Sequence, residues 1–277
     1  MKFFAALAMS LIASFAVPHA GAAQYLTPVD QMEPASLRLT DGWRAEADSR
    51  IVALVFELQP GWKTYWRAPG EMGIPPHFDW SGSENLQAAD PIWPVPEVHD
   101  ALGARYPAFS DRLVLPVRLR VADPSAPIRI RMTAAFGVCD DVCIPANAFV
   151  EMDLDAAATP GHEAALIEAA LASQPVDAGT GGLSTIACSL RSEGHVLELT
   201  AQMQFARPVA AEIVMVEAPI EDLWIADADI VQAGATITAT TQLDYFGDGP
   251  LVLDRALLRL TVIGEGQAVE IHGCPAP

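Results

Sequence analysis

Apolar and polar residues alternate along several segments of the chain, and this period of two restricts each of them to a β-strand. Between 113 and 121 every odd position is apolar, whereas Arg118 and Arg120 occupy the opposite face. The same alternation recurs over 128–136 and 147–154. Successive side chains of a strand point to opposite faces, so these segments predict half-buried strands. Residues 51–58 are apolar almost throughout and predict a more buried strand.

Two further alternating segments, 197–201 and 258–262, predict strands in the second half of the chain. The 22 prolines and 19 glycines among 277 residues favour short strands joined by turns. We therefore predict an all-β protein made of two antiparallel β-sandwiches, over 23–155 and 183–277. The stretch 61–96, rich in proline, glycine and tryptophan, is expected to be irregular and dense in turns.

A short helical linker is predicted between the sandwiches, over 156–182. Thr159 can cap a helix whose first position is Pro160. Leu166, Ile167, Ala170 and Leu171 then form one apolar face, which we expect to pack between the two domains. Gln174-Pro175 and a glycine-rich stretch over 179–182 end the helix.

Residues 1–22 have the features of a secretory signal peptide. Lys2 precedes a short apolar run, and small residues lead to cleavage after Ala22 or Ala23. An amino-terminal membrane anchor is the alternative, but the apolar run is shorter than the roughly 20 residues that a membrane-spanning helix needs. No later apolar run approaches that length, so we expect a periplasmic protein that does not insert into the membrane after cleavage.

The charge balance excludes several classes of partner. With 35 acidic and 16 basic residues, the net charge of −19 would repel nucleic acids and anionic membrane surfaces. No glycine-rich phosphate loop and no serine–histidine–aspartate pattern is present in the sequence. We therefore expect no nucleic-acid partner and no cofactor.

Cys139 and Cys143 lie in the predicted connection of roughly 137–146 between two strands. Residues at this spacing can form a disulfide, and the small ring they close contributes roughly 2 kcal/mol in the chain-entropy model. A strained bond in a surface loop exchanges readily, which favours a redox pair over a passive clip. Metal binding is a further alternative, because two thiolates can hold Cu(I) or zinc, although His77 and His99 are the only upstream candidates for additional ligands.

Asp140 and Asp141 adjoin this cysteine pair. Negative charge disfavours the thiolate, in contrast to the cationic surroundings that lower a cysteine pKa. We therefore expect the pair to be a restrained nucleophile, with no thiol pKa well below 7.

Cys188 and Cys274 lie near the start and the end of the second predicted sandwich. Adjacent first and last strands would place them side by side. A bond that closes a loop of about 86 residues would contribute roughly 4.5 kcal/mol in the chain-entropy model. We predict a structural disulfide, with a second redox or metal pair as the alternative.

Four sequence motifs together resemble the amino-terminal periplasmic domain of the DsbD-type thiol:disulfide interchange proteins. These motifs are Gly61-Trp62-Lys63-Thr64-Tyr65-Trp66-Arg67-Ala68-Pro69-Gly70, Pro75-Pro76-His77-Phe78-Asp79-Trp80, Asp111-Arg112-Leu113-Val114-Leu115-Pro116-Val117 and Val138-Cys139-Asp140-Asp141-Val142-Cys143-Ile144-Pro145. The likeness is greatest to the branch called suppressor of copper sensitivity. It covers about 26–154, with a looser likeness in the second half.

The resemblance implies immunoglobulin-like sandwiches and a cysteine pair that passes electrons from a membrane partner system to oxidised periplasmic proteins. Cys139 and Cys143 match the redox pair, and Cys143 matches the cysteine that forms the mixed disulfide with the donor. Tyr65 matches an aromatic residue beside the site. Residues 99–103 match a cap loop, with Asp100 at an acidic position and Leu102 where an aromatic residue would shield the pair more strongly.

The chain also departs from this family. Only three residues separate Cys139 from Cys143, whereas better-known members have five. The family's membrane region and thioredoxin-like domain have no counterpart in the sequence. We therefore expect a thiol:disulfide exchange carrier fed by a separate membrane reductase or thioredoxin-like donor. The alternative is a non-enzymatic copper-handling or protein-interaction module.

Overall fold

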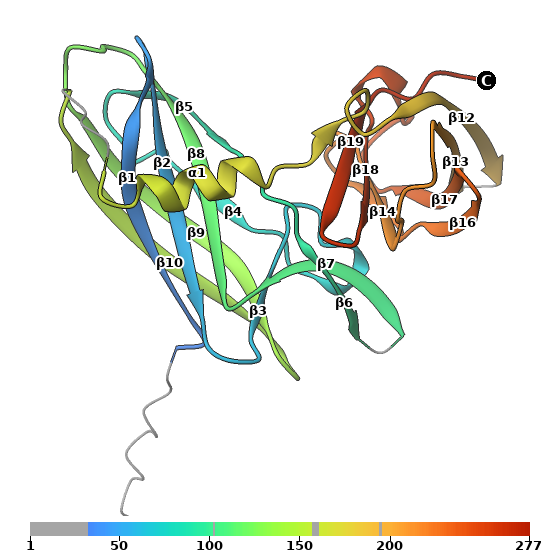
Figure 1. Ribbon diagram of the computed structural model, residues 1–277, viewed down its shortest axis with the longest axis horizontal. Helices are drawn as coiled ribbons and strands as arrows, with labels where there is room; N and C mark the ends of the chain where they lie inside the picture. The colour runs from blue at the N-terminus through green and yellow to red at the C-terminus, as the bar shows by residue number, and fades with distance from the viewer. Residues whose placement is uncertain (1–32, 102, 157–160, 194–195) are drawn as a thin grey trace, which may run out of the picture. The chain divides into compact units, whose positions relative to one another are not determined.

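The computed structural model describes residues 33–101, 103–156, 161–193 and 196–277. Over these residues the fold is nearly all β, as predicted, with four sheets that are almost entirely antiparallel and one α-helix (Figure 1). The predicted signal peptide, the predicted helix cap at Thr159 and Pro160, and Leu102 lie outside the described residues. None of the described helices has both the length and the hydropathy needed to cross a membrane.

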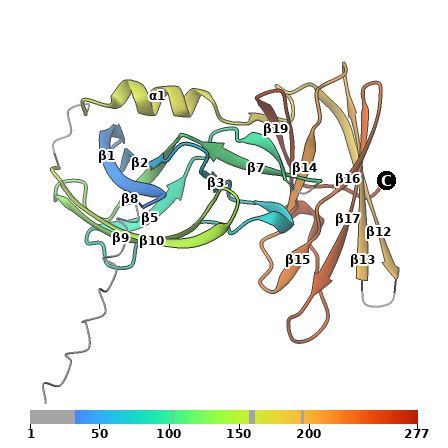
Figure 2. The ribbon, with the colours of Figure 1, turned by 90° about the horizontal axis from the view of Figure 1, so that it is seen from below.

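Residues 34–154 form the first two sheets, which face each other (Figure 2). The first sheet has the strand order β1 (Ala35–Glu46), β2 (Ser49–Leu58), β8 (Arg112–Val121), β5 (Leu86–Pro91). The second sheet has the order β10 (Cys143–Leu154), β9 (Ile128–Cys139), β3 (Lys63–Tyr65), β7 (Ala104–Ser110), β6 (Glu97–Ala101), and β4 (His77–Asp79) also pairs with β9.

The alternating segments of the sequence form the strands around the first core. In β8 the odd-numbered residues from Leu113 to Val121 are buried, while Arg118 and Arg120 are exposed. In β9 the even-numbered residues from Ile128 to Phe136 are buried in the same way. The strand predicted over 51–58 is β2, and nearly every residue of it is buried. The pattern-based prediction of these strands is therefore confirmed.

Two expectations for this half are wrong. The connection between β9 and β10 is only Asp140–Val142, because both strands extend beyond their alternating parts and end at the cysteines. The stretch 61–96 is not wholly irregular: it contains β3, β4, β5 and a 3-10 turn, η1 (Gly70–Met72). These strands have three to six residues, too few for a period of two to emerge from the sequence.

The second half of the chain forms the third and fourth sheets. The third has the order β11 (Val176–Asp177), β19 (Gln267–His272), β18 (Arg259–Gly264), β14 (Ile213–Glu217). The fourth has the order β12 (Leu183–Glu193), β13 (Val196–Phe205), β17 (Thr236–Tyr245), β15 (Leu223–Ile225), and β16 (Asp229–Ala233) also pairs with β17. A short 3-10 turn, η2 (Arg255–Leu257), precedes β18.

The third sheet buries side chains on both of its faces. One face, including Val214, Leu260 and Val262, belongs to the core shared with the fourth sheet. On the other face Ile213, Met215, Ile263 and Ala268 join the core cluster of the first two sheets. Sheets covered on both sides have nearly continuous apolar strands, and β14 reads Ile-Val-Met-Val-Glu.

The helix α1 (Ala164–Ala172) packs on the first sheet. Its buried Ile167 contacts the cluster formed by Ile51 and Ala53, on the face of the first sheet that points away from the first core. The expectation that this apolar face packs between two domains is therefore wrong. Arg38 of β1 fixes the start of the helix through two hydrogen bonds to Glu163, at 2.6 and 2.8 Å.

Cys188 and Cys274 form a disulfide. The expected reason for their proximity, adjacent first and last strands, is wrong: Cys188 lies on β12 in the fourth sheet, where it pairs with Ala201, and Cys274 follows β19 of the third sheet. The bond therefore connects the two sheets, and both cysteines are buried in the core between them.

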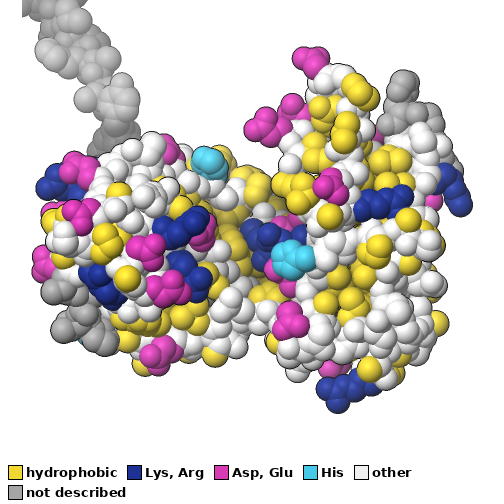
Figure 3. Space-filling view, turned by 90° about the horizontal axis from the view of Figure 1, so that it is seen from above, with side chains coloured by type: hydrophobic (Ala, Val, Ile, Leu, Met, Phe, Trp, Pro, Cys, Tyr) yellow, Lys and Arg dark blue, Asp and Glu magenta, His cyan; other side chains and the backbone are white. Residues whose placement is uncertain are grey.

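On the face shown in Figure 3, acidic and basic side chains are interspersed with one another, among hydrophobic and neutral surface. Exposed arginines form ion pairs with nearby carboxylates, such as Arg112 with Glu57 at 2.9 Å and Arg129 with Glu84 at 3.1 Å. Exposed pairs of this kind add little stability.

Candidate functional site: the Cys139–Cys143 hairpin

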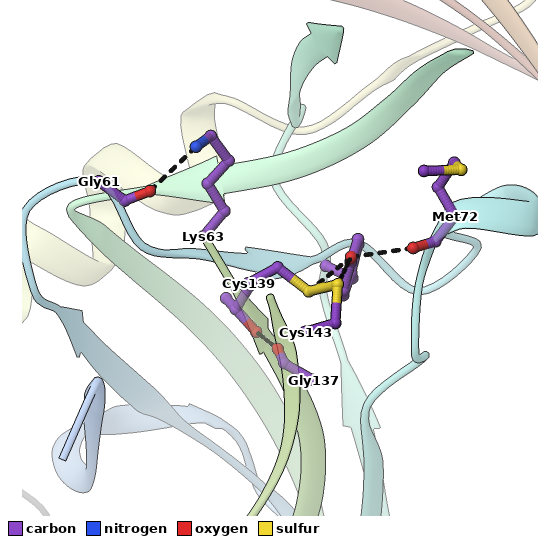
Figure 4. Close-up of a disulfide and its surroundings, with 8 residues drawn as sticks. Gly61, Lys63, Met72, Gly137, Cys139 and Cys143 are labelled. Atoms are coloured by element: carbon purple, nitrogen blue, oxygen red, sulfur yellow. Dashed lines mark hydrogen bonds between the residues drawn. A yellow bond between two sulfur atoms is a disulfide. The ribbon is translucent and has the colours of Figure 1, made fainter. Parts of the chain in front are cut away.

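Cys139 and Cys143 form a disulfide at the tip of the β9–β10 hairpin (Figure 4). The last residue of β9 and the first residue of β10 are directly opposite each other in the antiparallel register, with Cα atoms 4.1 Å apart. Directly paired residues on antiparallel strands have neighbouring side chains on the same face, which is the arrangement that a disulfide requires.

The two cysteines differ in their exposure to solvent. Cys139 is only 3% exposed, whereas Cys143 belongs to the exposed residues. Its neighbours Val142 and Ile144 are 66% and 42% exposed. A thiolate from another protein can therefore reach Cys143, and the sulfur of Cys139 is placed to act as the leaving group.

The hydroxyl of Tyr65 contacts both sulfur atoms. Its oxygen lies 2.8 Å from Sγ of Cys139 and 3.1 Å from Sγ of Cys143, and it donates a hydrogen bond of 2.9 Å to the carbonyl oxygen of Met72 (Figure 4). Burial raises the pKa of Tyr65, and the nearby Tyr106 adds to this rise, so the hydroxyl keeps its proton at neutral pH. The phenol carries a single proton and donates it to the Met72 carbonyl, so its contacts with the two disulfide sulfurs are close approaches of the oxygen.

The register of the second sheet brings these groups to one face. Lys63 lies opposite Cys139, and Tyr65 lies opposite Ala108 on the other side. Because side chains alternate, Tyr65, Cys139 and Tyr106 point away from the first core and form a small cluster of their own. The hydroxyl of Thr64 also bonds the carbonyl of Gly137 at 3.0 Å and ties β3 to β9.

Two glycines leave room for the Tyr65 ring. A Cβ atom on Gly73 would lie 2.5 Å from a ring carbon of Tyr65, and one on Gly137 would lie 3.1 Å from another. The contact at Gly73 would require one partner to move, and the contact at Gly137 would be tight enough to push the ring slightly away. Both glycines therefore permit the close approach of the ring to the disulfide.

The β6–β7 hairpin borders the same cluster. The Tyr106 ring is tilted against that of Tyr65, with ring centroids 5.7 Å apart, and Ala101 packs against the pair. His99 lies 5.8 Å from the Tyr106 ring, and its pKa is lowered chiefly by burial, an effect that Glu97 opposes. His99 and Ala101 of the expected cap segment thus lie beside Tyr106, and the shielding of the cysteine pair by this segment stays a prediction.

Asp100 is placed differently from its neighbours. It is opposite Arg105 in the hairpin and accepts a hydrogen bond of 3.3 Å from this residue. Side chains alternate along β6, so Asp100 points to the face opposite His99 and Ala101. Among the described contacts, Asp100 reaches neither cysteine.

Charged groups surround the hairpin tip. Asp140 and Asp141 are exposed, and the Asp140 carboxylate lies against Gly61. Lys63 is half-buried at the register position opposite Cys139, and its ammonium donates a hydrogen bond of 3.0 Å to the Gly61 carbonyl (Figure 4). Lys63 therefore supplies a positive charge that opposes the two carboxylates, an effect not anticipated from the neighbouring residues in the sequence.

Among the described residues, no group of three or more histidine, cysteine, aspartate or glutamate side chains could hold a metal ion. His77 is exposed on β4, and Nε2 of His99 lies 3.1 Å from Glu97 and 3.4 Å from Ser110. The structure does not assemble these histidines with the cysteines into a ligand set.

The structure thus brings together Cys139, Cys143 and Tyr65, with Asp140 and Asp141 at the rim. It adds Met72, Tyr106 and Lys63, which the sequence did not single out. No sequence pattern pointed to Met72, because it contributes only its backbone carbonyl to the site and every residue has one. Cys188 and Cys274 lie in a separate core.

Comparisons with known proteins agree with this geometry. Residues 36–153 match the family described as thiol:disulfide interchange protein DsbD, N-terminal. Among solved structures, the N-terminal periplasmic domain of ScsB from Proteus mirabilis matches with a TM-score of 0.63 and 21% sequence identity, over 87% of this chain and 92% of that chain. No curated protein matches the chain. The resemblance carried by the sequence motifs is therefore confirmed: it is to the DsbD N-terminal family, whose model matches residues 36–153.

Proposed function

We propose that the chain is a periplasmic thiol:disulfide exchange carrier that uses Cys139 and Cys143. The observation that carries this proposal is the asymmetry of the pair: Cys143 is an exposed residue, and Cys139 is buried with its sulfur beside the Tyr65 hydroxyl. The match to the family supports the class of chemistry. The proposal includes two immunoglobulin-like sandwiches, over 23–155 and 183–277, and a signal peptide over 1–22.

The first exchange step starts at Cys143. A thiolate of a dithiol donor attacks Sγ of Cys143, the bond between the two cysteines breaks, and its electron pair leaves on Cys139. The oxygen of the Tyr65 hydroxyl lies 2.8 Å from that sulfur, and its proton turns from the Met72 carbonyl to the new thiolate. A buried anion without a hydrogen-bond donor is costly, so the phenol lowers the free energy of this step.

The second step completes the transfer of two electrons. The donor's other thiolate attacks its own sulfur in the mixed disulfide, so that the donor is oxidised and Cys143 is released. The reduced pair then reverses these roles toward an oxidised periplasmic client: Cys143 attacks the client disulfide, and Cys139 resolves the mixed disulfide. We propose a membrane reductase or a thioredoxin-like protein as the donor.

The remaining cysteines have a different role in this proposal. The Cys188–Cys274 bond is structural, because both sulfurs are buried away from the exposed hairpin. Asp140 and Asp141 restrain thiolate formation at the hairpin tip, and Lys63 moderates their effect.

The equilibrium between the Cys139–Cys143 bond and glutathione tests the function. The full chain is equilibrated in buffers of graded glutathione ratio and alkylated, and the cysteine peptides are quantified by mass spectrometry. Exchange proteins have potentials between roughly −180 and −270 mV, and we expect this pair to fall there. A potential below about −300 mV would mark a structural bond and contradict the proposal. Cu(I) binding that survives oxidation of the pair would favour the copper-handling alternative.

A further inference from the structure

The segment 65–72 begins at Tyr65, beside the disulfide, and its last residue, Met72, returns to the Tyr65 hydroxyl. Tyr65 contributes the hydroxyl that contacts both sulfurs, and Met72 contributes the carbonyl that accepts the hydrogen bond from the same hydroxyl. The position of the phenol therefore depends on how this segment is held. Its middle part is bound by residues from the second half of the chain.

Arg67 makes the first of these contacts. Its guanidinium donates hydrogen bonds to Glu217 at 3.0 Å, to Glu270 at 2.5 Å and to Thr261 at 3.4 Å. Thr261 and Glu270 are directly paired between β18 and β19, and Glu217 lies on the neighbouring strand β14. The Arg67 side chain is 14% exposed, and its guanidinium carbon lies 3.9 Å from the centroid of the buried Trp66 ring.

Asp227 makes the second contact. It follows β15, and its Oδ1 accepts a hydrogen bond of 3.2 Å from the backbone amide of Glu71 in η1. Its carboxylate lies directly over Gly70, where a Cβ atom would collide with it. Gly70 has a φ of +68°, so the chain turns sharply here just before Met72.

We infer that the second half of the chain positions the Tyr65 hydroxyl against the disulfide, with Arg67 and Asp227 as positioning residues. The inference deepens the proposed exchange function and rests on it. Arg67 and Glu71 are fixed on either side of the turn, so the tyrosine and the Met72 carbonyl are held in one geometry. Release of either contact lets the hydroxyl leave the sulfur of Cys139, which lowers both the rate and the extent of disulfide reduction.

Variants of Asp227 in the full chain test the inference. In Asp227→Ala the Glu71 amide loses its acceptor, and we expect the equilibrium constant for reduction by glutathione to fall at least about threefold. Asp227→Asn keeps an oxygen that can accept this hydrogen bond and should stay close to the wild type. Asp229→Ala, at an exposed aspartate on the neighbouring strand β16, is the matched control and should change nothing.

A double-mutant cycle separates positioning from general support of the fold. When Tyr65→Phe has already removed the hydroxyl, Asp227→Ala should cause no further loss of reduction rate, measured with dithiothreitol as the probe. An equal loss with and without the hydroxyl would overturn the inference, because the effect would then bypass Tyr65. So would an unchanged equilibrium in Asp227→Ala.

Arg67 gives an independent measurement. Arg67→Lys keeps the positive charge but loses the planar fork that binds two carboxylates, and it should slow reduction in the same Tyr65-dependent manner. The retained Cys188–Cys274 bond and the near-ultraviolet circular dichroism report the fold of each variant. A wild-type pair with a structural potential would refute the proposed function, whereas normal wild-type exchange with unaffected variants would refute only the positioning role.

Discussion

At the level of single residues, the chemistry of the hairpin follows from the unequal surroundings of two otherwise identical sulfur atoms. Cys143 is exposed at the first position of β10, and Cys139 is buried at the last position of β9. Because they face each other across the strand pair, a one-residue shift of β10 would place Val142 or Ile144 opposite Cys139 and turn Cys143 to the other face of the sheet. The order of attack is therefore encoded in the register of one hairpin.

Single-cysteine variants test this order. In Cys139→Ser the remaining thiol is exposed, and in Cys143→Ser it is buried. We expect Cys143 to react with Ellman's reagent at least about tenfold faster than Cys139, since thiol reactivity requires access as well as thiolate. In denaturant the two rates should converge. Equal rates in the native proteins would contradict the proposed direction of attack.

Tyr65→Phe tests the hydrogen bond at the leaving sulfur. The variant keeps the ring that packs against Tyr106 and removes only the hydroxyl. A hydrogen bond of this kind is worth about 1 kcal/mol, so we expect reduction of Cys139–Cys143 by dithiothreitol to slow about fivefold. Tyr106→Phe is the control and should leave the rate unchanged, and a Tyr65→Phe rate equal to that of the wild type would remove the phenol from the mechanism.

At the level of secondary-structure elements, the sequence predicts what depends on local periodicity. The long strands β8 and β9 have five or more alternating positions, and their buried faces are correct. β3 has three residues and no detectable period, although it holds Tyr65 beside the cysteines. The apolar face of α1 predicts that the helix packs on something, but it does not tell which sheet the helix packs on. Asp100 was expected beside the cysteine pair because of its position in the cap segment. The alternation of side chains along β6 instead points it to the opposite face of the sheet.

The attachment of α1 gives a prediction for pH dependence. The hydrogen bond from Arg38, and next that from Thr40, lowers the pKa of Glu163 from 4.5 to about 2. A carboxylate whose pKa is lower in the folded state stabilises the fold fully above about 4.5. This contribution is lost as the pH falls toward 2.

Glu163→Gln should therefore lower the melting temperature at pH 6 more than at pH 3. The pair is partly exposed, so the effect stays below about 1 kcal/mol, or roughly 2–4 °C for a chain of this size. Thermal unfolding followed by circular dichroism measures it. Glu168→Gln, at an exposed position of the same helix, should show no such pH dependence. A Glu163→Gln deficit that is equally large at both pH values would refute the ion-pair explanation.

At the level of the whole molecule, the third sheet connects the two halves because both of its faces are buried. Met215, Thr261 and Glu270 lie in one row across β14, β18 and β19. The apolar member of this row joins the first core, and the two polar members bind Arg67. The sequence shows the polar residues of this row only as the apparent solvent side of alternating strands. Their partner Arg67 is 194 and 203 residues away along the chain, which local patterns cannot reveal.

Removal of the Cys188–Cys274 bond tests whether this bond stabilises the fold without taking part in exchange at Cys139–Cys143. Removing both cysteines, as Cys188→Ala with Cys274→Ala, opens a loop with a sequence separation of 86. The chain-entropy model gives a loss of about 4.5 kcal/mol, so we expect a large fall in melting temperature.

Near 20 °C, where the variant is still folded, Arg67 and Asp227 keep their contacts, and exchange of Cys139–Cys143 with glutathione should equal that of the wild type. On warming, the reduction rate of the variant should drop below that of the wild type as the second half unfolds and releases the Tyr65 segment. A defect already present in the folded variant would instead assign Cys188 and Cys274 to the exchange reaction itself.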